Sequence, residues 1–320
     1  MSNENSLRGR PTVSIGLPVF NGAAYVAGAI DSILAQTFED FELVICDNAS
    51  TDQTEVICRS YAAKDSRIRY LRNSQNVGSS GNFSKVFRES RGVYFKWHGH
   101  DDLIEPTYLE KLVEVLDADK DCVLAFPRTV MIDADGADSW CFLENLACDS
   151  ALPEERLAAW LAPWKDDFIN PVFGLMRREV VAKTDLMAPY LASDRPFMAH
   201  ITLLGRSTMV PECLFRRRVH EEMSTKANPN KADLGAFITG KRPVLVFKQW
   251  RLLYEYLKLI TRAPLETRSK LACYFLMLKW TKSRATRLLG ELMLPLVFNG
   301  KLTRLGHWTT RLLRPVIKLP

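Results

Sequence analysis

Two adjacent aspartates, Asp101 and Asp102, are the residues whose type and position most directly suggest chemistry. They follow the β-branched and aromatic run 93–97, which is typical of a buried strand, and they precede Pro106, where a helix is expected to begin. Ligands of open α/β sheets bind beyond the carboxyl ends of strands, and two neighbouring carboxylates there are costly unless a cation lies between them. The pair therefore indicates a ligand or metal site. The alternative is an acidic turn that caps the next helix.

Three further polar stretches follow predicted strands, at 18–21, 47–52 and 76–82. Because the carboxyl ends of parallel strands meet at one edge of a sheet, four such stretches predict a single assembled site. No G-x-G-x-x-G motif follows the first strand and no G-x-x-x-x-G-K-[ST] motif occurs in the sequence, which argues against a dinucleotide fold and a P-loop nucleotidase. The ligand is instead expected to be held by carboxylates and a metal.

The elements that must position these residues alternate along the first third of the chain. Strands are predicted at 13–17 (ended by Pro18), 41–46, 68–71 and 93–97, and helices open near 21, 52, 82 and 106. Strands that alternate with helices of about 10–15 residues are typical of βαβ units. The sequence therefore predicts a doubly wound α/β sheet, parallel in this part.

The next hundred residues are less regular. They are predicted to hold strands at 122–126, 172–176 and 210–218, a hairpin around 129–136, and helices at 153–161 and 198–204, with 137–165 otherwise irregular. From about residue 240 the pattern is helical, with breaks at 264, near 282 and at 295. We therefore divide the chain into a disordered lead-in (1–11), an α/β domain (12–225), a linker (226–240) and a basic amphipathic helical region (241–320).

The C-terminal region has the most uneven charge. Residues 241–320 hold 17 Lys and Arg against three acids, a net charge of +14, so residues 1–240 carry −8 of the chain's total of +6. Helices with Trp, Tyr, Lys and Arg at their margins can lie on an anionic membrane surface, or they can pack on the preceding domain with their cations in water. Both alternatives stay open. No recognised nucleic-acid motif occurs, so no nucleic-acid partner is expected.

Several features bear on where the protein works. No apolar run approaches the roughly 18 residues needed to span a bilayer, and the polar first residues lack the apolar core of a signal peptide. Seven cysteines lie scattered without a C-x-x-C pair, which favours reduced thiols. We expect a cytoplasmic protein, with a peripheral position at the inner face of the plasma membrane if the C-terminal helices bind lipid.

Five motifs, in order and spacing, resemble family 2 of the glycosyltransferases. They are VSIGLPVFN at 13–21, ILAQTF at 33–38, DNASTD at 47–52, NVG at 76–78, and Asp101-Asp102 with Pro106. The match covers about residues 12–225. The resemblance implies a GT-A fold with a doubly wound mixed sheet, and an inverting enzyme that uses nucleotide-diphosphate sugars together with Mg²⁺ or Mn²⁺.

The resemblance also implies roles for the polar strand ends. Asp101 would hydrogen-bond the ribose, and Asp102 would ligate the metal that bridges the two phosphates. In the family the second strand usually ends in two acids, one of which accepts a hydrogen bond from the base; here the pair is Asp47-Asn48, so the identity of the base stays open. Many relatives carry a further acid where this chain has Gly99. The other residues expected at the nucleotide sugar are Pro18, Phe20, Asn21, Asn76 and Gly78.

Inversion requires a general base on the acceptor side, and the resemblance places it at Asp194. Asp166 and Asp167 are alternative bases, and Asp194 could instead only cap a helix. Arg218 is expected to stabilise the leaving diphosphate and His220 to add a metal ligand, the alternative being a solvated basic strand end. Two further histidines, His98 and His100, are expected to support the carboxylates rather than bind the metal, and 170–174 is expected to line the acceptor pocket.

The sequence as a whole therefore predicts a glycosyltransferase. Its expected partners are a nucleotide-diphosphate sugar and a glycan or lipid-linked acceptor, and the family resemblance suggests a cell-surface polysaccharide pathway. The alternative is a non-catalytic domain that kept the fold and binds a sugar nucleotide or a glycan. Asn48 and Gly99, which depart from the family pattern, keep that alternative open.

Overall fold

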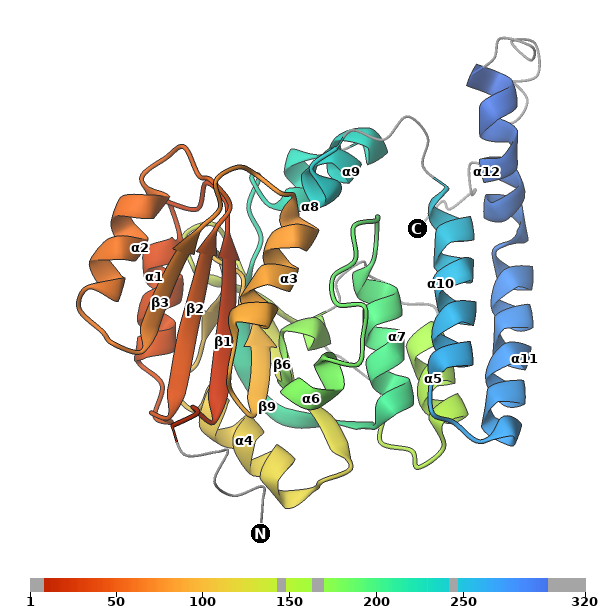
Figure 1. Cartoon of the computed structure of the whole chain (residues 1–320), viewed down its shortest axis with the longest axis horizontal. Helices are drawn as coiled ribbons and strands as arrows, with labels where there is room; N and C mark the ends of the chain where they lie inside the picture. The colour runs from red at the N-terminus through yellow and green to blue at the C-terminus, as the bar shows by residue number, and fades with distance from the viewer. Residues whose placement is uncertain (1–8, 143–147, 163–169, 229, 242–246, 299–320) are drawn as a thin grey trace.

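The protein is built around one nine-stranded sheet (Figure 1). The structure, a computed structural model, describes residues 9–142, 148–162, 170–228, 230–241 and 247–298. The strands are ordered β3-β2-β1-β4-β8-β6-β9-β5, with β7 paired to β6. Their bounds are β1 Val13–Val19, β2 Phe41–Asp47, β3 Ile68–Arg72, β4 Tyr94–Trp97, β5 Leu103–Ile104, β6 Cys122–Ile132, β7 Asp138–Phe142, β8 Leu175–Arg177 and β9 Arg206–Arg218.

Strands β1 to β4 form the parallel half of the sheet, as the alternating pattern predicted. Every residue of β1, β2 and β4 is buried, because helices cover both faces. Three helices pack on one face and α3 on the other; the bounds are α1 Val26–Leu34, α2 Thr54–Ala62, α4 Tyr108–Ala118 and α3 Ser79–Glu89. Pro18 does not end β1, which continues to Val19. It lies beyond the last residue pair with β4, Gly16–Trp97, where its missing N–H breaks no ladder bond.

The second half of the sheet is mixed. β8 is antiparallel to both β4 and β6, whereas β9 runs parallel to β6. The strands predicted at 122–126 and 129–133 are one strand, β6, which continues through register shifts around Arg128 and turns at Gly136 into β7. β7 lies in a region that was predicted to be irregular. The strand predicted at 172–176 was also misplaced, because η1 (Asn170–Phe173) precedes a β8 that begins only at Leu175.

The C-terminal helices pack against the α/β domain and do not form a separate unit. The 226–240 stretch, expected to be a linker, contains the last two residues of α8 (Ser224–Ala227) and all of α9 (Lys231–Thr239), and α9 packs on α3. Helix α10 (Lys248–Arg262) packs on α7 (Asp194–Leu204), and α11 (Thr267–Ser283) packs on α5 (Pro153–Leu161). Buried residues of α10 and α11 belong to the core cluster that also holds α3, α5, α6 (Arg178–Val181) and α7. Helices α10 and α11 therefore pack on the domain through the faces that carry these buried residues.

Two of the three predicted helix breaks are confirmed. Helix α10 ends two residues before Pro264, and α11 ends at Ser283. The third break, at residue 295, is wrong, since α12 (Ala285–Phe298) continues through it. Within the described residues, none of the helices combines the length and apolarity that crossing a bilayer would require. The predicted division into domains stays a prediction, and most of the predicted lead-in lies outside the described residues.

Candidate functional site

The two aspartates lie in the turn after β4, at the carboxyl edge of the parallel strands. Asp102 is 4% exposed, and its Oδ1 accepts a hydrogen bond of 3.0 Å from the backbone N–H of Arg218. The carboxylates fold back over Gly99, where an added Cβ would lie 2.5 Å from Oδ2 of Asp102 and 2.9 Å from Oδ1 of Asp101. No acidic side chain fits at residue 99 in this conformation. The glycine therefore permits the close approach of both carboxylates.

The electrostatics of the two carboxyl groups differ. Burial, together with the neighbouring charge of Asp101, raises the pKa of Asp102 to about 7. Burial alone would also raise the pKa of Asp101, but the imidazoles of His100 and His220 outweigh it, and the pKa of Asp101 is lowered. A cation bound beside Asp102 would offset the charge that burial disfavours.

Two buried residues, Lys96 and His98, form a chain of polar contacts to the backbone of the Asp101–Asp102 turn. Lys96 Nζ lies 3.0 Å from Nδ1 of His98, and Nε2 of His98 lies 3.1 Å from the carbonyl oxygen of Asp102. A carbonyl oxygen only accepts, so Nε2 carries the proton and Nδ1 accepts from Nζ of Lys96. Burial lowers the pKa of His98 well below its ordinary value, and the charge of Lys96 lowers it further. His98 thus supports Asp102 through its backbone, while His100 packs against the β1 loop beside Gly22.

The three consecutive arginines at the end of β9 point in alternating directions, because successive side chains of a strand face opposite sides. Arg218 is 8% exposed; its guanidinium donates to the carbonyl oxygens of Asp101, Asp133 and Ala134 and stacks on the ring of Tyr25. The predicted contact of Arg218 with a diphosphate would have to replace these bonds. Arg218 holds the β6–β7 turn beside the aspartates.

Arg217 faces the other way. Its Nη1 donates to Oδ1 of Asn170 at 2.6 Å, and its positive charge lowers the pKa of both Asp102 and Asp194, although burial raises both overall. The prediction from sequence missed this residue. The signal was available, since residues 216 and 218 of a strand share one face and residue 217 takes the other.

Asp194, the predicted base, is the first residue of α7 and is partly buried. Burial raises the pKa of its carboxyl group, against the opposing charges of Arg195, Lys248 and Arg217. Its Oδ1 accepts the N–H of the next residue, Arg195, at 3.0 Å, but the N-cap position of α7 is Ser193, so Asp194 is not the cap that the alternative predicted. The alternative bases, at 166 and 167, lie outside the described residues.

Two buried nitrogens near Arg217 and Asp101 have no partner among the described residues. One is Nδ2 of Asn170, whose Oδ1 is used by Arg217. The other is Nδ1 of His220; the Nε2 of that imidazole is 2.9 Å from Oδ2 of Asp101. Buried polar atoms without partners are rare, and such atoms at a polar site are available to a ligand.

The fit of a divalent metal can be judged from these donors. Carboxylate oxygens suit Mg²⁺ and Mn²⁺, and Asp102 lies where its buried charge would be offset. For His220 to ligate, it would use Nδ1 or give up the bond to Asp101. Within the described ranges no group of three His, Cys, Asp or Glu side chains could hold an ion. Asp102 could therefore hold a metal only if its remaining ligands were oxygens from outside the protein, such as those of a phosphate or water.

The loops after β1 and β2 form the second part of the site. Asn21 and Ala49 both have positive φ, 51° and 64°, which L-residues rarely adopt. The loops are joined by hydrogen bonds from Asn21 N–H to Ser50 Oγ and from Thr51 N–H to Asn21 Oδ1, both 2.9 Å. Phe20, just before them, is half-buried, and Pro18 is buried in β1. Asn21 therefore shapes the edge of the predicted base pocket.

Asp47 and Asn48, the two residues predicted to contact the nucleotide base, instead form hydrogen bonds within the protein. Asp47 is fully buried and accepts from Ser50 N–H and Tyr70 Oη, each at 2.8 Å, and from Arg72. Asn48 donates to Asn76 Oδ1 at 2.8 Å, and its oxygen accepts from Asn73 and from Val77 N–H. Both lone pairs of that oxygen are in use, so a contact with a base would have to replace one bond.

The C-terminal end of α9 packs against the loop Asn76–Gly78. A Cβ added to Gly78, whose φ is 80°, would lie 2.6 Å from Gly240 N and Ile238 O. Gly78 therefore permits backbone contact between this loop and the end of α9. The C-terminal half of the chain thus helps to fix the loop at residues 76–78.

The comparison with solved structures defines the class of protein. TarS from S. aureus (residues 1–349, in complex with UDP-GlcNAc) aligns with a TM-score of 0.63 at 16% identity, covering 88% of this chain and 79% of TarS. The mannosyltransferase PcManGT from Pyrobaculum calidifontis, in complex with GDP-Man and Mn²⁺, aligns with a TM-score of 0.51 at 17% identity, covering 94% and 84%. The fold is that of the GT-A glycosyltransferases.

The sequence comparison identifies the family. The sequence model described as "Glycosyl transferase family 2" matches residues 14–184, more than half of the chain. The chain belongs to glycosyl transferase family 2. An uncharacterized glycosyltransferase from Rickettsia bellii is 29% identical over 222 residues, which cover 68% of this chain but only 31% of that protein.

Proposed function

We propose that this protein transfers a sugar from a nucleotide-diphosphate sugar to an acceptor hydroxyl, with inversion and with the help of Mg²⁺ or Mn²⁺. The observation that carries the proposal is that one cation, Arg217, acts electrostatically on two carboxyl groups, Asp102 and Asp194, of two different elements. Burial raises the pKa of both carboxyl groups. Perturbed carboxyl groups gathered at the carboxyl edge of a sheet are typical of a catalytic site.

The residues of the site divide into a donor group and an acceptor group in this proposal. On the donor side, Asp102 holds the metal, Asp101 binds the ribose, and Arg217 lies where it can neutralise charge that grows on the diphosphate. The bound metal supplies further neutralisation of that leaving group. On the acceptor side, Asp194 accepts the hydroxyl proton as the oxygen attacks the sugar carbon opposite the departing phosphate, and a raised pKa makes it a stronger base.

The donor nucleotide and the metal are proposed by analogy. TarS was solved with UDP-GlcNAc, and PcManGT with GDP-Man and Mn²⁺. A uridine or guanosine diphosphate sugar is therefore the first donor class to test here, with Mn²⁺ as the first metal. We propose a glycan or lipid-linked acceptor, a role in cell-surface polysaccharide synthesis and a cytoplasmic location on the family resemblance alone.

The proposal is tested in two stages. A thermal-shift screen of UDP, GDP and dTDP sugars, each with and without Mn²⁺, identifies the donor, because a ligand of the native state raises its melting temperature. Release of the nucleoside diphosphate is then measured with the selected donor and candidate acceptors. Metal-dependent binding with acceptor-stimulated turnover is expected. Binding without turnover for any acceptor would favour the non-catalytic alternative. No binding of any donor would contradict both sugar transfer and a sugar-nucleotide-binding domain.

A further inference from the structure

The C-terminal helices expose an unusual amount of apolar surface. Of the fourteen large hydrophobic side chains that are exposed in the described part of the chain, nine lie on α10, α11 and α12. On α11 they are Leu271, Phe275 and Leu278, which are 64%, 58% and 68% exposed. The spacing i, i+4, i+7 puts these three in one row along the helix. Scattered exposed hydrophobics are normal, but a continuous row is a sign of an interaction surface.

This row is additional to the surface that packs the helices on the domain. The inner face of α11 buries Cys273, Met277 and Trp280 in the core, and α10 buries Leu252 and Tyr256 there. An amphipathic helix needs one apolar stripe to pack, and its opposite face is ordinarily polar. The helix α11 therefore carries a second apolar stripe that its own fold does not use.

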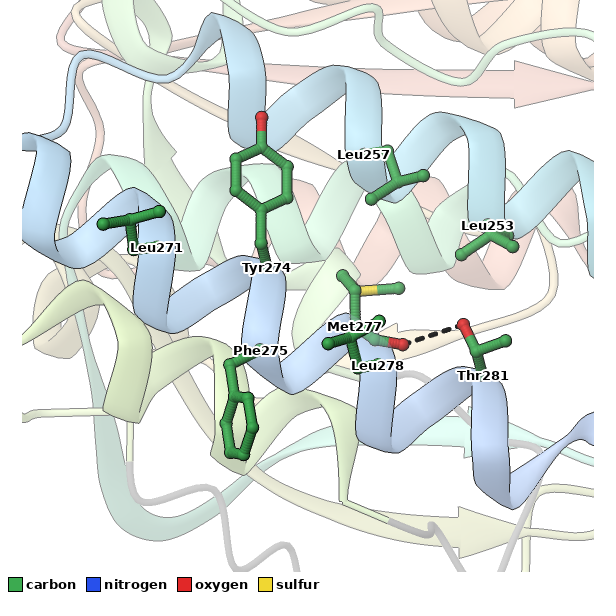
Figure 2. Close-up of a pocket in the computed structure, with 8 residues that line it drawn as sticks. All are labelled: Leu253, Leu257, Leu271, Tyr274, Phe275, Met277, Leu278 and Thr281. Carbon is green, nitrogen blue, oxygen red and sulfur yellow. Dashed lines mark hydrogen bonds between the residues drawn. The ribbon is translucent and has the colours of Figure 1, made fainter.

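A groove of about 510 Å³ runs between the two helices on this outer side (Figure 2). Leu253 and Leu257 of α10 form one wall, and the α11 row with Tyr274 forms the other. Thr281 also borders it, but its hydroxyl donates to the carbonyl of Met277 at 2.8 Å. The groove consequently offers few polar groups to a ligand.

The charges around this surface are nearly all positive. From Lys248 to Arg287 the chain holds ten Lys and Arg. Of the three acids on or between these helices, Glu255 and Glu291 are buried, where Glu255 pairs with Arg251 and Lys258. Only Glu266, in the turn before α11, is exposed. The surface that α10–α12 present is therefore apolar and cationic.

We propose that this outer face of α10 and α11 docks on an anionic membrane surface. Apolar side chains such as Phe275 would enter the boundary between headgroups and acyl chains, and the flanking cations would contact lipid phosphates. Such docking requires a cation beside an exposed apolar side chain. Lys279 provides one, since its Nζ lies 4.9 Å from the centroid of the Phe275 ring. Arg251, Lys258 and Arg262 pair with Glu255 or Asp185, but Lys279, Lys282 and Arg287 form no ion pair among the described residues. Their charge favours anionic lipid over an apolar patch on another protein.

The orientation suits a membrane-bound acceptor, an extension that rests on the proposed function. Helix α10 begins with Lys248, whose charge acts on Asp194, and it packs along α7, which begins at Asp194. The docked face thus belongs to the helix that lies directly behind the proposed base. An acceptor held at a bilayer would approach from this side of the domain.

The test uses the full chain, because α10 and α11 share the core and their removal would unfold it. Flotation with vesicles of phosphatidylcholine and phosphatidylglycerol is compared with phosphatidylcholine alone. We expect binding to the anionic vesicles that weakens with salt, and a loss of about tenfold or more in the triple variant Leu271→Ser, Phe275→Ser, Leu278→Ser. The matched control, Val56→Ser, Val93→Ser, Leu152→Ser, removes three exposed apolar groups elsewhere (64%, 42% and 47% exposed) and should bind as the unchanged chain does.

Four outcomes would overturn the proposal. They are no vesicle binding by the unchanged chain, equal binding to neutral vesicles, undiminished binding by the α11 variant, and a change in oligomeric state of that variant in the absence of lipid. The last would show a protein interface instead. Thermal unfolding checks that the variant keeps its fold. The assay needs neither donor nor acceptor, so its failure is separate from a failure of the proposed transfer reaction.

Discussion

The two sides of the candidate site treat their polar groups in opposite ways. On the nucleotide side, Asp47 and Asn48 are buried, and their oxygens are occupied by bonds from the protein. On the catalytic side, Asn170 and His220 each have a buried nitrogen with no partner among the described residues, and burial raises the pKa of Asp102 and Asp194. One side is a completed scaffold, whereas the other holds groups that are costly until a ligand arrives.

This difference separates two kinds of polar residue that look alike in a sequence. A side chain whose hydrogen bonds are complete stabilises the fold, and its loss leaves buried partners unpaired. A side chain kept unpaired or charged in a buried place lowers stability and is retained for function. Substitutions on the two sides should therefore separate stability from activity.

Asp102→Asn should have the largest effect on the catalytic side. The amide cannot supply the charge that a divalent metal requires, so metal-dependent binding of the nucleotide should be lost. Isothermal titration with the donor and Mn²⁺ measures this, with metal-free titration as the control. Unchanged affinity in the variant would remove Asp102 from the metal site.

Asp194→Asn should leave donor binding intact and lower turnover by at least about 10². The reason is that the amide cannot take the proton of the acceptor hydroxyl. Single-turnover kinetics at saturating donor would detect this effect, with thermal shift by the donor as the check on binding. Turnover near that of the unchanged chain would move the base to residues 166 or 167.

Neighbouring arginines of β9 give a matched pair for the comparison. Arg217→Met should lower kcat by about tenfold or more, because it removes the cation near both carboxyl groups. Arg218→Met should mainly lower the melting temperature, because three carbonyl oxygens lose their donor. Measuring both kcat and thermal unfolding for each variant tests the assignment, and the reverse pattern would restore Arg218 as the catalytic cation.

On the scaffold side, Asn48→Ala should destabilise the fold by about 2 kcal/mol, since the donors of Asn73 and Val77 lose their buried acceptor. Urea unfolding measures this free energy. Asp102→Asn provides the contrast, because it removes a buried charge and should not lower stability in the absence of metal. An Asn48 variant of normal stability that no longer binds donor would make Asn48 a base contact after all.

The smallest expected effect is on pH dependence. A base acts only when ionised, so activity should fall as pH is lowered through the pKa of Asp194. Burial raises that pKa, and the acid limb of kcat should lie at a higher pH than an ordinary aspartate would give. Arg217 opposes the shift, so Arg217→Met should move the limb to still higher pH. A limb that does not move in this variant would argue against contact between the two charges.

The parallel half of the fold could be predicted from sequence because each element is local. Apolar runs such as 41–46 and polar ends such as 47–52 mark a strand and its carboxyl edge without reference to the rest of the chain. The candidate site followed from that edge, and Asp102 lies there as expected. The role of each residue within the site could not be predicted from such local patterns.

The missed features all depend on contacts between distant residues. Arg217 donates to Asn170 whereas the Arg218 guanidinium donates to the carbonyl of Asp101, because the two side chains take opposite faces of β9. Asn48 is occupied because Asn73 and Val77, more than twenty positions later, donate to it. The supposed linker became α9 because its end meets Gly78 across the fold. Composition indicates none of these pairings.

The contact between Glu291 and the start of α10 has a consequence for how the chain is made. Its carboxylate accepts the N–H groups of Gln249 and Trp250, a turn of helix that has no cap of its own in sequence. Those donors are translated 42 and 41 residues before their acceptor. Helix α10 therefore leaves the ribosome with an incomplete first turn, and the domain can close fully only after α12 has followed.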